Sequence, residues 1–123
     1  MIGAMVGAAC GGEGAASGGT GTGGASCRPS GIRLRVTVMD TAFDATCLAA
    51  PADAAFTIRF DNEDSDSHNL DIQKGGVSVF AGDVVIGPKV VTYRVDPLPP
   101  GAYTFRCDIH PTQMFGTFIS GQP

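Results

Sequence analysis

The stretch that decides the fold of this chain is YTFRCDIHPTQMFG, residues 103–116. Apolar and polar residues alternate through its first part, which is the period-two pattern of a half-buried β-strand that ends at Cys107. A short loop follows and carries His110 and Met114. A thiolate, an imidazole and a thioether are soft to borderline ligands that together favour copper. The stretch therefore predicts a metal-binding loop at the end of a strand.

A blue-copper site has a trigonal set of two imidazoles and one thiolate, with a weak axial thioether. The loop supplies one imidazole, and the chain has one other histidine, His68. His68 opens the segment HNLDI, which is predicted to be a further strand. A β-sandwich can bring the start of one strand beside the end of another, so we expect His68 to meet the loop. The predicted metal ligands are His68, Cys107, His110 and Met114.

Other interpretations of these residues remain open from the sequence. Zinc also binds two histidines and a cysteine, although a thioether is a poor ligand for it. Taken singly, His110 could be an ordinary loop histidine, Met114 a packing residue, and Cys107 half of a disulfide. The combination and its spacing favour copper over each of these readings.

Alternating apolar residues mark strands elsewhere in the chain. The predicted strands span residues 32–38, 56–60, 68–72, 77–80, 84–86, 91–95, 103–107 and 117–120. Glycine and proline turn signals separate them, and no segment has a sustained helical period. The pattern predicts an all-β, antiparallel sandwich or barrel of about seven or eight strands. Tyr93, Tyr103 and Phe105 are expected to be core residues of these strands.

Composition limits the possible functions. The chain has 123 residues, enough for one domain, of which 43% are hydrophobic and 16% are charged. Its net charge is −4 and its lysines and arginines form no cluster in the sequence, which argues against nucleic acid as a partner. No apolar run is long enough for a membrane-spanning helix.

The N-terminal region is expected to lie outside the folded domain. Residues 1–10 are small and apolar and end at Cys10, like the end of a bacterial lipoprotein signal, although the stretch contains no positively charged n-region. Residues 11–30 are predicted to be a glycine-rich flexible linker, and residues 31–123 the folded domain. A lipidated Cys10 could tether the domain to a membrane; alternatively, this is a flexible terminus with an incidental cysteine.

Cys27 and Cys47 are a candidate disulfide pair, because Cys10 and Cys107 each have another context. The bridge would close a loop of about 20 residues and contribute roughly 3 kcal/mol in the chain-entropy model. It would also imply an oxidising compartment. Sequence alone leaves the connectivity open.

These segments resemble the cupredoxin family, which includes plastocyanin and amicyanin. The resemblance covers roughly residues 32–120 and lies mainly in His68-Asn69 and in the pattern C-x2-H-P-x2-M-x-G that begins at Cys107. It implies a Greek-key β-sandwich that binds one type 1 copper ion, with Met114 as the axial ligand. Asn69 matches the family residue that hydrogen-bonds across to the loop carrying the cysteine.

The loop differs in length from both relatives. Three residues separate His110 from Met114, whereas plastocyanin has four and amicyanin two. The resemblance therefore implies the ligand types more firmly than it implies the axial distance, the reduction potential or the colour of the site.

The resemblance implies an electron carrier, which we expect to be a monomer. The lipoprotein-like N-terminus and the candidate disulfide predict the periplasmic or extracellular face of a bacterial membrane. No Ser–His–Asp set or other catalytic constellation is visible, so we expect no enzymatic activity. Electrons would leave by outer-sphere transfer through the edge of His110, where redox proteins would dock transiently against an apolar rim. One alternative is a protein for copper delivery, storage or sensing, and another is a metal-free binding domain. A third is a small copper enzyme, which would need more histidines than the two present.

An acidic run precedes His68 in residues 61–66. It could be a docking face for a basic redox partner. It could equally be a solvated loop whose Asp and Asn residues form turns.

Overall fold

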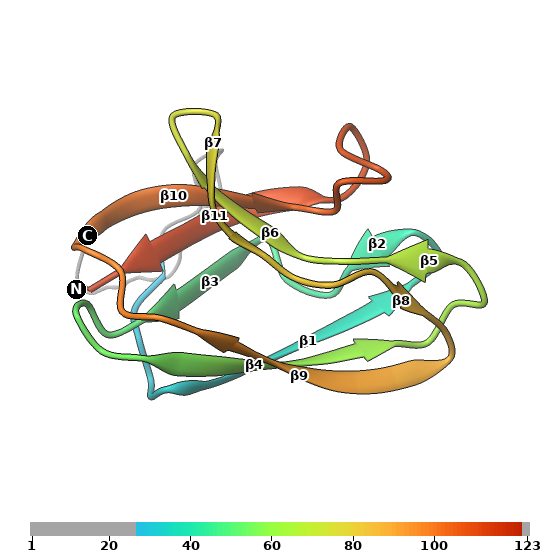
Figure 1. Ribbon diagram of the computed structural model, residues 1–123, viewed down its shortest axis with the longest axis horizontal. Helices are drawn as coiled ribbons and strands as arrows, with labels where there is room; N and C mark the ends of the chain where they lie inside the picture. The colour runs from blue at the N-terminus through green and yellow to red at the C-terminus, as the bar shows by residue number, and fades with distance from the viewer. Residues whose placement is uncertain (1–26, 122–123) are drawn as a thin grey trace, which may run out of the picture.

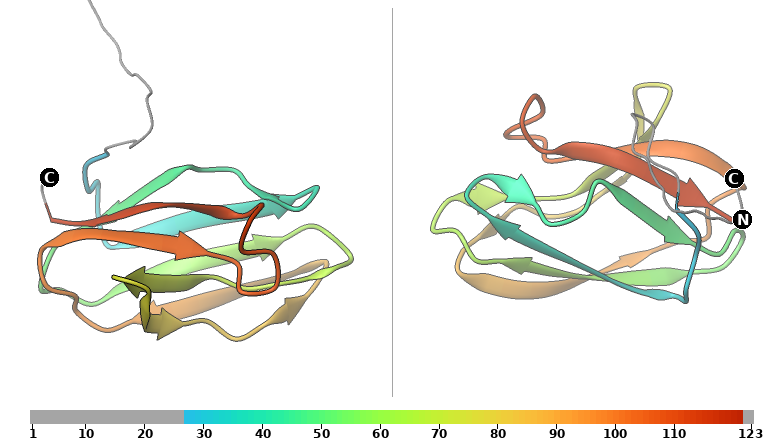
Figure 2. Two further views of the ribbon diagram at one scale, coloured as in Figure 1. Left: turned by 90° about the horizontal axis from the view of Figure 1, so that it is seen from above. Right: turned by 180° about the vertical axis from the view of Figure 1, so that it is seen from behind.

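The computed structural model describes residues 27–121, which form two large β-sheets packed face to face and one small two-stranded sheet (Figures 1 and 2). Every regular element in this range is a β-strand, which confirms the all-β prediction. The described range also contains no helix with the length and hydropathy to cross a bilayer. The predicted signal remnant and most of the predicted linker lie outside the described residues.

The three long strands of the first sheet form the lower layer in Figure 1. Its strands, in spatial order, are β2 (Ala42–Phe43), β1 (Arg33–Met39), β4 (Phe56–Asn62) and β9 (Lys89–Val95). Along β1, Val36 and Val38 are buried while Arg33 and Arg35 are exposed, as the period-two pattern requires.

The second sheet carries the predicted metal-binding loop. Its strands, in spatial order, are β3 (Cys47–Ala50), β11 (Phe115–Ser120), β10 (Gly101–Arg106), β6 (Asp71–Lys74) and β7 (Val77–Ala81). β10 and β11 form an antiparallel pair. A separate two-stranded sheet pairs β5 (Ser67–His68) with β8 (Val85–Ile86).

Strand direction differs in part from the antiparallel expectation. β1 pairs with β4 in parallel, and β11 pairs with β3 in parallel, so both large sheets are mixed. The strands β2 and β3 were not predicted, because their sequences, AF and CLAA, contain no alternation of apolar and polar residues.

The predicted strand 68–72 is divided into β5 and β6. Asn69 and Leu70, which separate them, are consecutive and both buried. The side chain of Asn69 hydrogen-bonds to Asp108 and to the Gly82 carbonyl, so it is committed to the neighbouring loops where the ladder is interrupted.

The core fills the space between the two sheets. Its largest fully buried side chains are Phe60, Phe105, Phe118, Ile58, Leu70 and Ile72. Tyr93 and Tyr103 are also buried, which confirms that these aromatic residues belong to the core. The resulting rigid sandwich holds the loops at its ends in fixed positions.

The predicted disulfide is present between Cys27 and Cys47, with their Cα atoms 6.1 Å apart. It joins the start of the described chain to β3 across a separation of 20 residues. Among residues 27–121, Cys107 is the one free cysteine, and it is buried.

Candidate metal site

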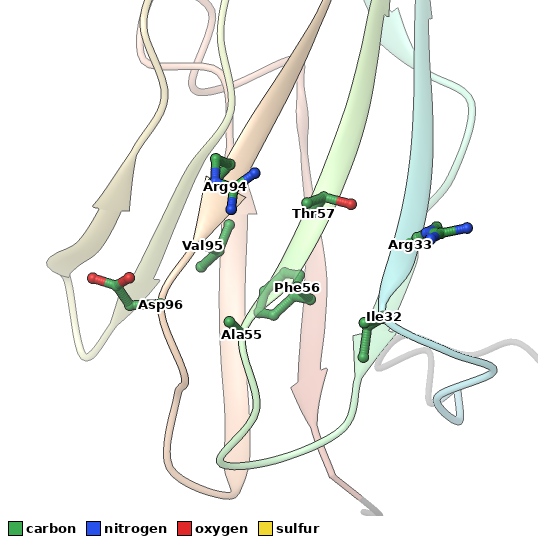
Figure 3. A pocket seen from close by; sticks show the side chains of 8 residues that line it. All are labelled: Ile32, Arg33, Ala55, Phe56, Thr57, Arg94, Val95 and Asp96. Atoms are coloured by element: carbon green, nitrogen blue, oxygen red, sulfur yellow. The ribbon is translucent and has the colours of Figure 1, made fainter.

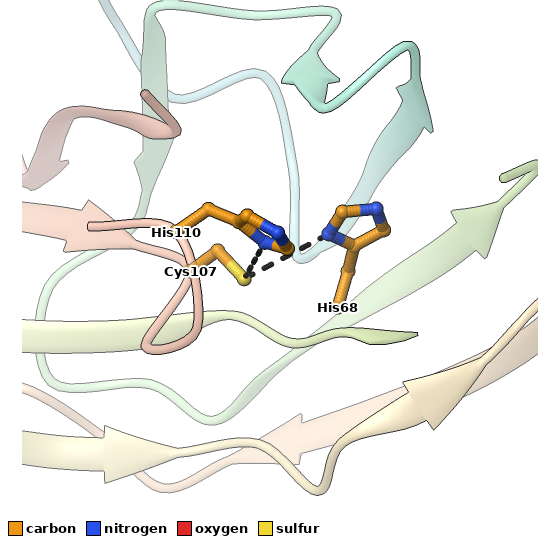
Figure 4. A group of neighbouring side chains, drawn as sticks. All are labelled: His68, Cys107 and His110. Atoms are coloured by element: carbon orange, nitrogen blue, oxygen red, sulfur yellow. Dashed lines mark hydrogen bonds between the residues drawn. The ribbon is translucent and has the colours of Figure 1, made fainter. Parts of the chain in front are cut away.

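Three of the four predicted ligands have their ligand atoms together at one end of the sandwich (Figure 4). Cys107 directly follows β10, and His110 lies on the loop that leads to β11. His68 ends the short strand β5, which comes from a different part of the chain. The Cys107 Sγ atom lies 3.9 Å from His68 Nδ1 and 3.7 Å from His110 Nδ1.

These distances suit a shared metal ion. Metal bonds of about 2.0–2.3 Å at trigonal angles would hold sulfur and nitrogen about 3.8 Å apart. The two imidazole rings also lie close together, with centroids 4.9 Å apart. The donor set is therefore two imidazole nitrogens and one thiolate around a single point, which is the trigonal set expected for blue copper.

Burial differs among the predicted ligands. His68 and Cys107 are fully buried and Met114 is 1% exposed, whereas His110 is only partly buried. Ile109, next to His110 in the loop, and Phe115, the first residue of β11, are 47% and 62% exposed. Of the four predicted ligands, His110 is the one that reaches the surface, and apolar side chains lie close to it in the sequence.

Backbone hydrogen bonds close the loop that carries the ligands. The Cys107 N–H donates to the Met114 carbonyl at 2.9 Å, and the Met114 N–H donates to the His110 carbonyl at 2.9 Å. The His110 N–H in turn donates to the Cys107 carbonyl at 3.2 Å. These bonds bring the backbone of Met114 next to the two other loop ligands and fix the loop independently of any ion.

Asn69 connects the two parts of the site, as predicted. Its Oδ1 accepts the Asp108 N–H at 2.8 Å, and its Nδ2 donates to the Asp108 carboxylate at 3.0 Å. Nδ2 also donates to the Gly82 carbonyl at 3.0 Å. Because Asn69 follows one ligand and Asp108 follows another, these bonds hold the two ligand segments in register.

A family model described as a cupredoxin-like domain matches residues 24–119. This chain belongs to the cupredoxin-like family. A search of curated protein sequences found no significant match.

Several solved structures share the fold of this cupredoxin. Auracyanin A, described as a "blue" copper protein from Chloroflexus aurantiacus, aligns with a TM-score of 0.67 and 20% identity over 75% of this chain and 100% of its own. Dithionite-reduced auracyanin from Roseiflexus castenholzii aligns with a TM-score of 0.66 and 18% identity, over 73% of this chain and 97% of its own. Amicyanin from Paracoccus versutus aligns with a TM-score of 0.55 and 21% identity, over 71% of this chain and 79% of its own.

The cupredoxin site has an acidic neighbour that the sequence did not single out. The Asp64 Oδ2 atom lies 2.9 Å from His68 Nε2 and also accepts the Thr41 N–H at 2.9 Å. Its Oδ1 accepts the Asp40 N–H at 2.8 Å. The backbone hydrogen bonds from Thr41 and then Asp40 lower the pKa of Asp64, so the carboxylate is ionised at neutral pH. In the sequence, the only sign of this contact is the acidic run in residues 61–66. That run contains four carboxylates, and the sequence does not show which of them meets His68.

Two further carboxyl groups, those of Asp71 and Asp108, lie close to Asn69. Burial, and then the hydrogen bond to Asp108, raise the pKa of Asp71. Burial opposes ionisation of Asp108 as well, but hydrogen bonds from Asn69, Asp71 and Arg106 lower its pKa overall. Asp71 therefore keeps its proton to a higher pH than an ordinary carboxyl and donates it to Asp108. The Asp71 Oδ1 atom is buried and has no hydrogen-bond partner in the described structure.

We expect Asp71→Asn to stabilise the protein at pH 7 relative to the parent, by about 1 kcal/mol for one retained hydrogen bond. A raised pKa in the folded state means that the parent loses stability as pH rises from the ordinary value of 3.8 through the folded-state pKa. The amide has no proton to lose and can still donate to Asp108. Urea unfolding of the copper-free proteins at pH 4 and pH 7 measures the difference, which should grow with pH.

The control for this substitution is Asp96→Asn, which removes an exposed carboxylate after β9. The Asp96→Asn variant should have the same free energy of unfolding as the parent at both pH values. An Asp71→Asn variant with the same pH dependence as the parent would contradict the shared proton.

Gly116, the last residue of the predicted motif, lies opposite Phe105 in the β10–β11 pair. A Cβ atom at this position would come within 2.6 Å of the Thr46 carbonyl and 2.5 Å of the Phe105 ring. Because one obstacle is backbone and the other is a fully buried ring, neither can move away easily. The motif requires glycine here for space.

We expect Gly116→Ala to lower the free energy of unfolding by about 2 kcal/mol, as is typical of overpacking. Chemical denaturation of the copper-free protein measures it. Gly76→Asn is the matched control, since a Cβ at Gly76 meets no atom within 4 Å and asparagine tolerates its φ of 81°. Equal stability of the Gly116→Ala variant and the parent would show that β11 can shift away from Phe105.

The cupredoxin also has a surface pocket of about 370 Å³ at the opposite end of the sandwich (Figure 3). It is lined by the starts of β1 and β4 and the end of β9, including Arg33, Thr57 and Arg94. None of its lining residues is a histidine or cysteine, so it lacks the imidazole and thiolate ligands of a blue-copper site.

Proposed function

We propose that this cupredoxin is a one-electron carrier whose single type 1 copper ion is bound by His68, Cys107, His110 and Met114. The observation that carries the proposal is the meeting of one buried cysteine sulfur and two imidazole nitrogens, from separate segments, within 4.8 Å of one another. The four-residue assignment adds Met114 because its thioether belongs to a buried side chain of the same closed loop. The likeness in fold to proteins described as blue copper proteins supports it.

Bound copper would supply a centre that gains and loses one electron. The protein holds the ligand atoms in place before and after transfer: hydrogen bonds through Asn69 fix the two ligand segments, and the core fixes the strands. Burial of His68 and Cys107 excludes water from their side of the site. Little movement is then needed when the charge changes, which favours fast outer-sphere transfer.

The partly exposed ring of His110 is the proposed point of electron entry and exit. Exposed Ile109 in the loop and exposed Phe115 at the start of β11 offer an apolar surface for a brief encounter with a redox protein. Small and short-lived interfaces are typical of such partners. The same burial argues for a carrier over a delivery protein, since two ligands without solvent access would release an ion slowly.

An oxidising compartment is part of the proposal, because disulfides such as Cys27–Cys47 persist there. The periplasmic or extracellular face of a bacterial membrane meets this requirement. A lipid on Cys10 lies outside the described residues and stays a prediction, which mass spectrometry of the native N-terminal peptide would test.

The experiment for the proposed function is titration of the copper-free protein with Cu(II), followed by reductive and oxidative cycling. We expect one equivalent to produce intense visible absorption from thiolate-to-copper charge transfer, which returns fully after each cycle in the presence of a mild chelator. Loss of copper to the chelator during cycling would indicate delivery instead. Absence of the absorption would reject the copper site.

A further inference from the structure

Asp64 joins the candidate copper site to a turn of the other sheet. Its carboxylate accepts three hydrogen bonds, from the backbone N–H groups of Asp40 and Thr41 and from the ring of His68. Asp40 and Thr41 form the turn between β1 and β2. A carboxylate with three donors at 2.8–2.9 Å has its position and orientation set by the fold.

The turn has an unusual backbone that suits an anion. Asp40 and Thr41 have φ values of 55° and 57°, in the left-handed region that residues with a side chain seldom adopt. Such a conformation costs energy and persists when the surroundings require it. Here it aims two successive N–H groups at one carboxylate, in the manner of an anion-binding nest.

The loop holds Asp64 from its other side as well. The Asp64 N–H donates to Asn62 Oδ1 at 3.0 Å. The amide of the buried Asn62 donates to the carbonyls of Asp66 and Val85, each at 2.9 Å. The position of Asp64 therefore does not depend on His68 or on an ion.

This arrangement determines which nitrogen of His68 is free. Both oxygens of the Asp64 carboxylate accept backbone N–H groups, so Nε2 is the donor in the contact of His68 with Asp64. Nδ1 then presents its lone pair, and it is Nδ1 that faces the Cys107 sulfur. His68 is fully buried, so no water competes for either nitrogen by direct access.

We propose that Asp64 is a positioning residue that fixes the tautomer of His68 and lowers the reduction potential of the copper. The inference rests on the proposed function. A carboxylate on the far nitrogen of a metal-binding imidazole makes the ring a stronger donor. A stronger donor and a nearby negative charge both favour the oxidised ion, which carries one more positive charge.

The decisive comparison is between Asp64→Asn and Asp66→Asn in the copper-loaded protein. Each substitution removes one negative charge from the same loop. Asp66 has an exposed side chain, and its backbone oxygen, which Asn62 binds, is unchanged by the substitution. The pair therefore separates the hydrogen bond to His68 from the general effect of charge.

Asp64→Asn should weaken Cu(II) binding relative to Cu(I) at least tenfold, the lower end of effects seen for such outer partners. A tenfold change corresponds to a potential raised by about 59 mV for one electron. Asp66→Asn should give a much smaller rise, because its charge is exposed to solvent and screened. Equal shifts in the two variants would overturn the proposal.

A measurement on the unmodified protein keeps the inference testable if Asp64→Asn does not fold. Nitrogen-15 NMR of the copper-free protein should show His68 protonated at Nε2 and unprotonated at Nδ1. The opposite tautomer would overturn the role of Asp64 without bearing on copper binding. Conversely, a correct tautomer with no charge-transfer absorption on adding copper would reject the proposed function alone.

Discussion

Replacing Cys107 with serine should abolish the intense visible absorption of the copper-loaded protein. The absorption requires a thiolate bonded to copper, and Cys107 is the one free cysteine among residues 27–121. A hydroxyl is almost the same size, so the buried position can accommodate it with the fold intact. The measurement is the visible spectrum at one equivalent of Cu(II), with far-ultraviolet circular dichroism to verify the fold.

The control for this experiment is Cys10→Ser, which removes a cysteine that the proposed site does not use. Its spectrum should match that of the parent. Retention of the full absorption and of copper affinity in Cys107→Ser would mean that another sulfur binds the ion, and the ligand assignment would then be wrong.

Removing the disulfide should have the largest effect on stability. Substituting both Cys27 and Cys47 with serine frees a loop whose ends are 20 residues apart. The chain-entropy model assigns roughly 3 kcal/mol to such a closure, mainly by restricting the unfolded chain. Denaturant unfolding of the copper-free proteins should show this loss, together with a steeper dependence on denaturant because the unfolded chain expands.

The double substitution avoids leaving an unpaired cysteine that could form wrong bridges. Its copper-loaded spectrum should keep the charge-transfer absorption, since neither sulfur belongs to the proposed ligand set. A loss of well under 1 kcal/mol would show that the start of the described chain is already held in place without the bridge.

The alternation of apolar and polar residues predicts where strands lie, but not how they pair. The alternation in 32–38 predicted β1 because each residue of a strand carries its own burial signal. It did not predict the parallel pairing of β1 with β4, since pairing direction depends on how the connecting chain runs. It also missed the break at Asn69 and Leu70, where a side-chain hydrogen bond to the loop of the site replaces the regular ladder.

The sequence by itself determined the chemistry of the candidate site: one thiolate, two imidazoles and a thioether, three of them in a single short loop. Ligand type is a property of each side chain and can be read without a fold. Only the tertiary structure decided that Asp64, and no other carboxylate of its run, meets His68, and that Nδ1 faces the sulfur. Those contacts depend on angles and distances of a few ångströms between segments far apart in the chain, which the packing of the two sheets alone defines.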